Sequence, residues 1–460
     1  MAREVAAAKT KRFGRAAGLL SVGVGSAGLL TYVYFSLASH VLDKVDYGEV
    51  VVLWSAVFVT ISVLFRPVEQ LLSRTIAERQ ARERPIGQPL RVAATIQLAV
   101  AGAFAVVALL FRGPLQDDLL SGNETLYWIF VTAVLAFAAS FFARGFLAGS
   151  RRFGLYGALL LAESTARVSF ALAVAVGIAS GQTAVALGIA AAPLLSLTVV
   201  PLAFAGRAVA RSRAAGTASS APASAQSEFT LAAGGGFAAA VLLIMVSEQT
   251  LLNAGPLLIR ASEGAAAAGF IFNVLMIARA PLVLFQAVAT SLLPHLTRLR
   301  SSAAEEDAEA FRLSIRFTLG AIAAFAAVVG LVVAIAGPQL MQLAFGKKFV
   351  YDRIGLEIVT VGMGFYLASG TLNQAALAQG QVRRAAACWV GCALAFIGWN
   401  LLPVLDEFRR VEVGFAGAAA LLCGLLYRLY RHPRARPEDV VGPGSPQELE
   451  ARLAAADEAS

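Results

Sequence analysis

The sequence predicts an all-α integral membrane protein in which twelve transmembrane helices form two six-helix lobes. Of its 460 residues 58% are hydrophobic and 15% are charged, and the mean hydropathy is +0.71, a composition far from that of a soluble domain. Apolar stretches of about 20 residues, the length of helix that crosses a bilayer, recur along the chain. A small, polar and basic segment at 207–228 divides these stretches into two groups of six.

The first group forms a predicted N-lobe at 15–206, which follows a basic cytoplasmic tail at 1–14. Each span is bounded by charged or turn-forming residues. The six spans are roughly Arg15–Ser39, Tyr47–Leu72, Leu90–Phe111, Leu126–Leu147, Leu155–Ala179 and Val185–Ala205.

The segment 207–228 is predicted to be a flexible cytoplasmic linker, because small and polar residues dominate it. A C-lobe at 229–431 follows, and a hydrophilic cytoplasmic tail at 432–460 completes the sequence. The spans of the C-lobe are roughly Phe229–Ile259, Ala265–Leu296, Ile315–Ala336, Ile354–Ala378, Ala385–Leu405 and Val413–Tyr430.

The placement of lysine and arginine predicts that both termini are cytoplasmic. With the N-terminus inside, the inner segments hold about 26 of these residues and the outer loops about eight. Lys347 and Lys348 depart from this bias, and the stretch GPQLMQLAFGKKF around them suggests re-entrant or interfacial structure. The prediction is therefore a multi-pass protein of the cytoplasmic membrane.

The two groups of spans resemble a duplication. A shift of about 221 positions places Gly48 on Gly269 and Leu71-Leu72 on Leu292-Leu293. Six spans per repeat would give both halves the same orientation, related by an axis along the membrane normal with a cavity between them. The alternative is a chance similarity between two helices rich in leucine and alanine.

Arg279 is the most informative polar residue, because it lies near the middle of the predicted span Ala265–Leu296. An arginine at that depth costs several kcal/mol unless it faces protein or a water-filled cavity. Gln286 lies seven residues later and so shares its helix face. Arg279 is expected either to contact an anion in a cavity or to pair with a structural partner such as Glu248.

The second span carries Arg66, Pro67 and Glu69 near its inner end. Arg66 and Glu69 share a helix face, and Pro67 can kink the span because it removes a backbone hydrogen bond. Arg66 either faces the cavity or extends to the membrane interface. Glu69 is a candidate for proton coupling because of its depth.

The fifth span holds Glu163 and Arg167 four residues apart, with the acid first, the favourable order for a helical ion pair. They form either a structural pair or part of a coupling or gating device. In the seventh span Glu248 is a candidate proton site or a packing partner of an arginine. Gln249 and Asn253 share one face of that span and are candidate substrate contacts.

Several function classes find no support in the sequence. It shows no nucleophile–His–carboxylate set, no phosphate-binding loop and no cluster of metal ligands, so neither catalysis nor a cofactor is expected. The net charge of +9 reflects cytoplasmic lysine and arginine, and a nucleic-acid partner is not expected. The cavity is predicted to suit an amphiphile with an anionic head, since arginine pairs well with phosphate.

Several strings resemble the polysaccharide branch of the multidrug/oligosaccharidyl-lipid/polysaccharide exporter superfamily. They are TYVYFSLASHVLDKVDYGEVVVLW, RPVEQLLSRTIAER, Glu163 with Arg167, ARAPLVLFQAVATSLLPHL and LNQAALAQGQ, and the resemblance spans about Arg15–Arg431. It implies two lobes in a V around a cavity and flipping of a lipid-linked oligosaccharide by alternating access. It also implies polysaccharide polymerase and glycosyltransferases as partners, with Arg66 and Arg279 matching the family's cavity arginines by place.

Three alternatives have different signatures. A proton- or sodium-coupled drug or cation exporter of the same fold would have acids dominating its cavity, which Arg279 disfavours. A membrane glycosyltransferase or polymer ligase would need large outer loops, whereas those here hold roughly 20 residues or fewer. A major-facilitator transporter would carry a loop rich in Gly, Asp and Arg after the second span, which SRTIAERQARER does not resemble.

Overall fold

The computed structural model describes residues 2–82, 84–201, 231–279 and 305–432, and every regular element in these ranges is helical. Eleven of the described helices are long and apolar enough to cross a membrane. The predicted all-α membrane class is therefore confirmed. The predicted linker, the C-terminal tail beyond His432, and Gln286 lie outside the described residues.

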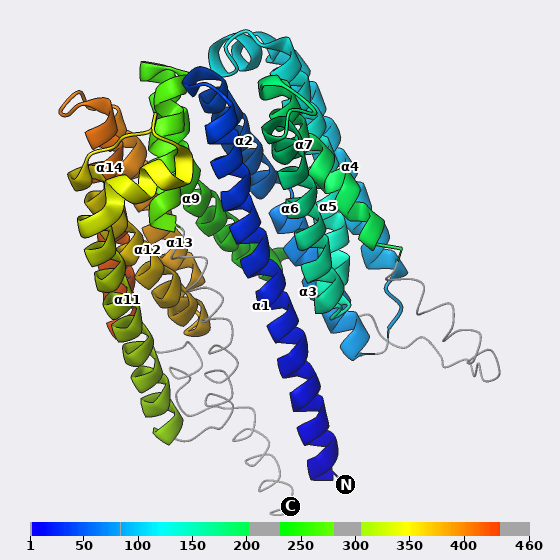
Figure 1. Ribbon diagram of the computed structural model, residues 1–460. Helices are drawn as coiled ribbons and strands as arrows, with labels where there is room; N and C mark the ends of the chain where they lie inside the picture. Colours follow the sequence, from blue (N-terminus) through cyan, green and yellow to red (C-terminus); the bar gives the residue numbers. More distant parts are fainter. Residues whose placement is uncertain (1, 83, 202–230, 280–304, 433–460) are drawn as a thin grey trace, which may run out of the picture.

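The first bundle is built from the helices that precede the predicted linker (Figure 1). They are α1 (Ala2–Val41), α2 (Lys44–Leu64), α3 (Arg66–Ala81), α4 (Gly87–Leu110), α5 (Glu124–Gly149), α6 (Phe153–Ala175) and α7 (Gly181–Ser196), with the short elements η1 (Pro114–Leu119) and η2 (Leu197–Val199). Helix α1 begins at Ala2, so the predicted basic tail is helical and continuous with the first span.

The second bundle contains α9 (Leu231–Glu263), the Ala265–Arg279 helix, α11 (Glu305–Phe345), α12 (Arg353–Ala378), α13 (Val382–Asn400) and α14 (Glu407–Arg431). Gly264, whose φ is +88°, separates α9 from the Ala265–Arg279 helix, a conformation that glycine adopts without steric cost. The predicted eighth span is thus helical as far as it is described.

The same packing scheme recurs in the two bundles. In the first, α1 packs on α6, α6 on α7, α7 on α5, and α5 on α4. In the second, α9 packs on α13, α13 on α14, α14 on α12, and α12 on α11. The order of pairing is the same when each helix is replaced by its counterpart in the other half, which is the arrangement that a duplication would produce.

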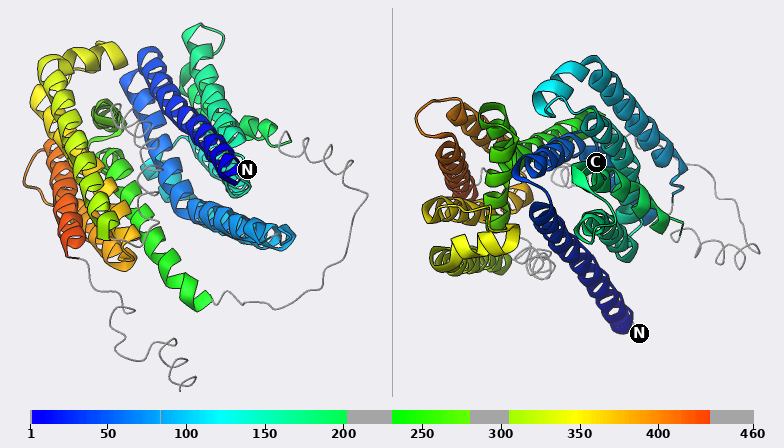
Figure 2. Two further views of the ribbon diagram at one scale, coloured as in Figure 1. Left: turned by 90° about the horizontal axis from the view of Figure 1, so that it is seen from below. Right: turned by 45° about the horizontal axis from the view of Figure 1, so that its top comes forward.

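The second predicted span bends where its sequence contains proline. Helix α2 ends at Leu64 and α3 begins at Arg66, with Pro67 in its first turn. Because proline has no N–H to donate, the helix is free to change direction there. Figure 2 shows α3 leaving the line of α2. Arg66 therefore lies at the bend.

Several helices begin at the end that carries the α1–α2 turn, and acidic or amide side chains cap them. Asp43 accepts from the backbone N–H groups of Val45 and Asp46 at 2.8 Å, and Asn123 accepts from Leu126 at 3.1 Å. Such caps satisfy backbone donors that a helix leaves free at its first turn. We call this end of the molecule the closed end, because the two bundles meet there.

The contact at the closed end joins α1 and α2 to the second bundle. The Oγ of Ser36 donates to the carbonyl of Ala344 at 2.5 Å, and the hydroxyl of Tyr47 donates to Asn273. The Nζ of Lys348 donates to the carbonyl of Leu42. These contacts tie residues more than 200 positions apart.

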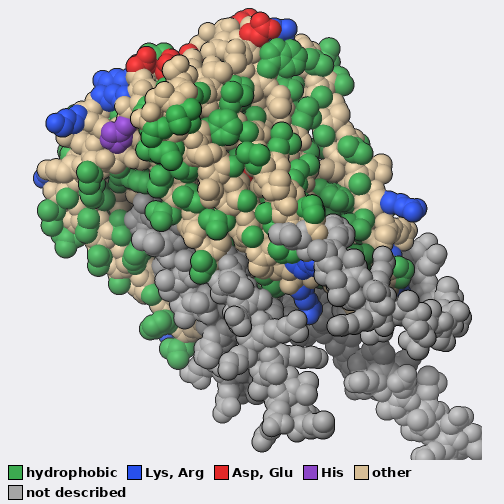
Figure 3. All heavy atoms as spheres, turned by 45° about the vertical axis from the view of Figure 1, so that its right-hand side comes forward, with side chains coloured by type: hydrophobic (Ala, Val, Ile, Leu, Met, Phe, Trp, Pro, Cys, Tyr) green, Lys and Arg blue, Asp and Glu red, His purple; other side chains and the backbone are tan. Residues whose placement is uncertain are grey.

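Large hydrophobic side chains cover the flank of the bundles, and charged ones gather at the closed end (Figure 3). The exposed apolar residues include Leu110, Leu331 and Leu394, each more than 60% exposed. An apolar flank of this extent is the surface that lipid tails would cover.

Candidate functional site

Charged side chains form a series of alternating sign inside the first bundle. Its members, in the order in which they interact electrostatically, are Arg66, Glu69, Arg144, Glu163 and Arg167, contributed by α3, α5 and α6. Ion pairs removed from water persist when each charge has an opposite neighbour. Three arginines face two glutamates here, so the series keeps one positive charge in excess.

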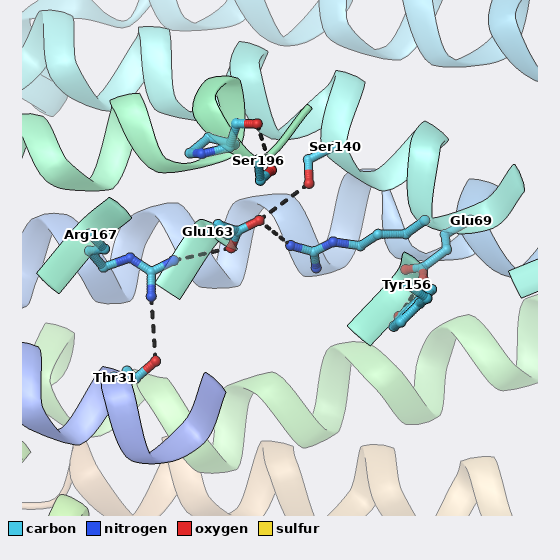
Figure 4. Close-up of polar contacts among 9 residues, drawn as sticks. Thr31, Glu69, Ser140, Tyr156, Glu163, Arg167 and Ser196 are labelled. Carbon is cyan, nitrogen blue, oxygen red and sulfur yellow. Dashed lines mark hydrogen bonds and ion pairs between the residues drawn. The ribbon is translucent and has the colours of Figure 1, made fainter. Parts of the chain in front are cut away.

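Glu163 lies between two arginines of this series, as Figure 4 shows. Its Oε2 accepts from Arg144 at 2.5 Å and from Ser140 at 3.3 Å, and its Oε1 accepts from Arg167 at 3.1 Å. The side chain is only 6% exposed. The predicted pair with Arg167 is thus formed, and a second arginine shares the same carboxylate.

Arg167 is held by more than its carboxylate. Its guanidinium lies over the ring of Trp54, 4.5 Å from the centroid, and its Nη1 donates to Thr31 at 3.4 Å. Trp54 belongs to α2 and Thr31 to α1, so Arg167 connects three helices. A guanidinium stacked on an aromatic face is attracted by the negative charge of that face, and the attraction is stronger where water is excluded.

Glu69 lies between Arg66 and Arg144 in the series. It accepts a hydrogen bond from the hydroxyl of Tyr156 at 2.9 Å and interacts electrostatically with Arg144 and Arg66. Figure 4 shows the Glu69–Tyr156 pair further along the bundle from Glu163. Glu69 is therefore a member of the charge series and not an isolated acid.

A second polar centre lies in the other bundle, around Tyr366 of α12. Its hydroxyl donates to Glu248 of α9 at 3.1 Å. Arg279 interacts electrostatically with the same tyrosine. In the described part of the chain no hydrogen bond or ion pair joins Arg279 to Glu248, so the partner suggested by sequence is replaced by a shared tyrosine.

Arg279 has donors without acceptors. Its Nε and Nη2 are buried atoms that find no hydrogen-bond partner in the structure as described. A buried donor without an acceptor loses the interaction it would have with water, at a cost of about 1–3 kcal/mol or more for a charged group. The described structure therefore leaves two donors of this guanidinium unsatisfied.

Arg66 connects the two polar centres. Besides Glu69 in its own bundle, it interacts electrostatically with Tyr366 of the other bundle. The two candidate cavity arginines, Arg66 and Arg279, thus interact electrostatically with the same tyrosine from different bundles. Glu248 is joined to that tyrosine by the hydrogen bond described above.

The remaining predicted contacts do not join this tyrosine. Gln249 and Asn253 are each 7% exposed, and the Nδ2 of Asn253 donates to the Oε1 of Gln249 at 2.9 Å. This hydrogen bond runs along α9, and no described contact connects the two amides to Arg66 or Arg279. Their role as substrate contacts stays a prediction.

Sequence reasoning missed two residues of these centres. Arg144 lies inside a predicted span but close to its inner end, where an arginine usually extends to the interface. Its position within the apolar stretch was nonetheless a usable signal. Tyr366 carried no signal, because a tyrosine in a span does not differ by sequence from one that packs against lipid.

No family model matches the chain, and no curated protein matches its sequence. Solved structures do match. A mutant of the Vibrio cholerae MATE transporter VcmN aligns over 92% of this chain and 97% of its own, with 16% identity and a TM-score of 0.63.

Two further structures align over a similar length. The eukaryotic MATE transporter AtDTX14 covers 97% of this chain and 98% of its own, with 14% identity and a TM-score of 0.60. An inward-facing conformation of a multidrug resistance MATE family transporter of the MOP superfamily covers 91% and 94%, with 13% identity and a TM-score of 0.60. At these identities the likeness establishes the fold: this chain has the fold of the MATE transporters.

Proposed function

We propose that this protein is a membrane transporter that flips a polyprenyl-diphosphate-linked oligosaccharide, or a related lipid-linked glycan precursor, across the cytoplasmic membrane by alternating access. The observation that carries the proposal is Arg279, whose buried Nε and Nη2 have no described acceptor and which, like Arg66 of the other bundle, interacts electrostatically with Tyr366. A diphosphate bears several negative charges, and the planar donor fork of arginine matches phosphate oxygens.

Alternating access is supported by the one-sided contact between the bundles. The described hydrogen bonds between them, from Ser36, Tyr47, Lys348 and Arg260, lie at the closed end. With the N-terminus inside, as the bias in lysine and arginine predicts, the closed end faces outward. The conformation is then inward-facing, and substrate would be taken from the cytoplasmic leaflet.

Ion coupling is assigned to Glu248 in this proposal. Its described partner is a neutral hydroxyl, whereas Glu163 is already engaged by two arginines and Glu69 interacts with Arg144. A carboxylate that is not neutralised by a cationic side chain is free to take up a proton or a metal cation. Transport that continues unchanged after the pH and sodium gradients are collapsed would remove this assignment.

The second candidate function is export of drugs or other organic cations. It is favoured by Glu248, a half-buried acid at the polar centre of the C-lobe, and by the fold shared with a multidrug resistance transporter. This candidate predicts that a lipophilic cation stabilises the purified protein and that Glu248→Gln abolishes the effect. Arg66 and Arg279 beside the same tyrosine oppose it, because like charges repel a cationic ligand.

The test of the proposal is reconstitution in liposomes with a fluorescent polyprenyl-diphosphate oligosaccharide and an impermeant quencher. Protein that flips the lipid makes the quenched fraction rise from about half towards completeness. Arg279→Ala is expected to slow this rise by at least about tenfold, since a lost charged hydrogen bond is worth roughly 1.5–3 kcal/mol. The matched control is Arg112→Ala, which removes an arginine that is 43% exposed and paired with Glu124 at the closed end.

The same proposal includes a cytoplasmic linker at 207–228, glycan-assembly enzymes as partners, and a location in the cytoplasmic membrane. A linker of that composition would let the two lobes move as units around the central site. Polymerase and glycosyltransferases would supply and consume the lipid-linked glycan. If neither wild-type protein nor any variant raises the quenched fraction, the lipid-flipping proposal is wrong. Stabilisation of the purified protein by a lipophilic cation then tests the second candidate function.

A further inference from the structure

Tyr366 is placed where charged side chains of three other helices converge. It is 6% exposed, its hydroxyl donates to Glu248 of α9, and it interacts electrostatically with Arg279 and with Arg66 at the start of α3. A phenol has one proton to donate and lone pairs to accept with. With the proton directed to Glu248, the oxygen lone pairs remain available to the arginines.

The ring of Tyr366 is fixed by its neighbours. It meets Trp389 edge to face, with centroids 6.1 Å apart and an interplanar angle of 85°, and lies 6.4 Å from the ring of Phe415. Trp389 is itself held, because its indole N–H donates to Asn373 at 3.1 Å. The hydroxyl therefore has a defined position and determines where the Glu248 carboxylate lies.

Glu248 and Arg279 both interact with Tyr366, yet no described ion pair joins them. The Nε and Nη2 atoms of Arg279 have no acceptor among the described residues, and Glu248 is the acid that shares Tyr366 with it. An acid and a base in a site removed from water attract strongly, and their pairing would neutralise the arginine. A neutralised Arg279 would bind an incoming anion weakly.

We propose that Tyr366 is a positioning residue that holds Glu248 away from Arg279 and so keeps Arg279 available for the phosphate groups of the substrate. The inference rests on the proposed function, in that it assumes an anionic group at Arg279. It adds a residue with a separate role: Tyr366 acts on the ligand through Glu248. It also explains why an acid and an unneutralised arginine coexist in one site.

The test is a double-mutant cycle on the purified full-length protein in detergent, with geranylgeranyl diphosphate as the probe. Dissociation constants are measured for wild type, Tyr366→Phe, Glu248→Gln and the double variant. Tyr366→Phe is expected to weaken binding about tenfold, because Glu248 is released to pair with Arg279. In the Glu248→Gln background the same substitution is expected to change binding by less than about twofold, because no competing carboxylate remains.

The matched control is Tyr351→Phe, which removes another tyrosine–glutamate hydrogen bond, to Glu412, in the same bundle but at the closed end. It is expected to leave probe binding unchanged. Melting temperatures of all variants without probe separate a folding defect from a binding defect. Rescue by Glu248→Gln is the decisive readout, because a purely structural role of Tyr366 would not be relieved by it.

The outcomes separate this inference from the function on which it rests. If wild type does not bind the probe, the anion site is wrong and the positioning role falls with it. If wild type binds and Tyr366→Phe binds equally well, the anion site stands and the positioning role is wrong. If Tyr366→Phe weakens binding equally with and without Glu248, Tyr366 contacts the ligand directly, which also overturns the positioning role.

Discussion

Gly48 of α2 and Gly269 of the Ala265–Arg279 helix face each other across the contact between the two bundles. A Cβ added to Gly269 would lie 3.3 Å from the Cα of Gly48 and 3.0 Å from the ring of Tyr47. A Cβ added to Gly48 would overlap the carbonyl oxygen of Ala265. The two positions that a shift of about 221 residues aligns are thus in direct contact, as expected for equivalent residues beside a pseudo-twofold axis.

Gly48→Ala is therefore expected to disfavour the conformation in which the closed end is shut. The carbonyl of Ala265 is backbone and cannot move aside as a side chain would, so overpacking should cost about 1–3 kcal/mol, or roughly 5- to 150-fold in population. The measurement is the distance between spin labels at Val41→Cys and Val350→Cys, both exposed at this end, in a background without the native cysteines.

Gly102→Ala is the matched control, because a Cβ at Gly102 of α4 meets open space. It should leave the label distance unchanged. A Gly48→Ala protein whose label distances match those of wild type would show that the helices separate at no cost, and that this contact does not restrict opening.

The helices and the bend of the second span could be predicted because their signals are local. The predicted span Leu126–Leu147 corresponds to Glu124–Gly149, and the proline at position 67 marks the place where α2 gives way to α3. Hydropathy over about 20 residues reports the environment of each segment directly. Helix length was predicted less well: α1 begins before Arg15, since nothing in the basic residues there prevents helix from continuing, and α11 runs over Glu305–Phe345 where Ile315–Ala336 was predicted.

The polar centres could be predicted only in part, because they depend on which helix faces meet. The pair of Glu163 and Arg167 lies on one helix, and its spacing is visible in the sequence. Arg144 and Tyr366 join their centres from other helices, at 19 and 118 positions from their hydrogen-bond partners. Hydropathy does not determine the rotation of a helix about its axis when both of its faces are apolar.

Glu163 is expected to be the least replaceable member of the charge series. Glu163→Gln would leave Arg144 and Arg167, with side chains 11% and 3% exposed, without their shared carboxylate. Breaking a buried pair from one side typically costs about 3–5 kcal/mol. Arg144→Gln should cost less, because the pair of Glu163 and Arg167 remains balanced. The measurement is the free energy of unfolding in mixed micelles.

The double variant Glu163→Gln/Arg144→Gln provides the internal check on that order. It removes one charge of each sign, so it should be more stable than Glu163→Gln alone despite carrying an additional substitution. A double variant less stable than both single ones would show that the two arginines do not depend on the shared acid.

At the closed end, Asp352 is expected to make stability depend on pH. Burial disfavours its carboxylate, but the N–H of Gly355 and the guanidinium of Arg409 outweigh this effect, and the pKa of Asp352 lies below its usual value. A lowered pKa stabilises the folded state above the unfolded value of about 3.9, and that contribution is lost as the pH falls through the folded pKa.

Asp352→Asn should therefore lower the melting temperature slightly at pH 7 and by less at a pH below the folded pKa of Asp352, where its carboxyl group is protonated. The change is small because the Asp352 side chain is 48% exposed, and asparagine can still cap α12. Asp118→Asn, at an exposed aspartate of η1 with no described ion pair, should show no such difference. Equal shifts at both pH values would assign the effect to the cap rather than to the charge.

Trp54 is expected to couple the charge series to the contact between the bundles. Its ring lies under Arg167 and meets Phe35 edge to face at 5.0 Å, and Phe35 lies 4.5 Å from Phe272 of the second bundle. Trp54→Leu should destabilise the protein by about 3 kcal/mol, through the lost aromatic volume and the lost stacking of the guanidinium.

The specific part of that loss is measured by combining Trp54→Leu with Arg167→Met. If the stacked pair stabilises the fold, the double variant should lose less free energy of unfolding than the sum of the single variants, by about 0.5–2 kcal/mol. Phe130→Leu supplies a comparison for the aromatic volume alone, since Phe130 is 3% exposed and packs on Phe104, away from the arginine. Additive losses for Trp54 and Arg167 would mean that the tryptophan only fills space, and that the arginine is held by Glu163 and Thr31 without it.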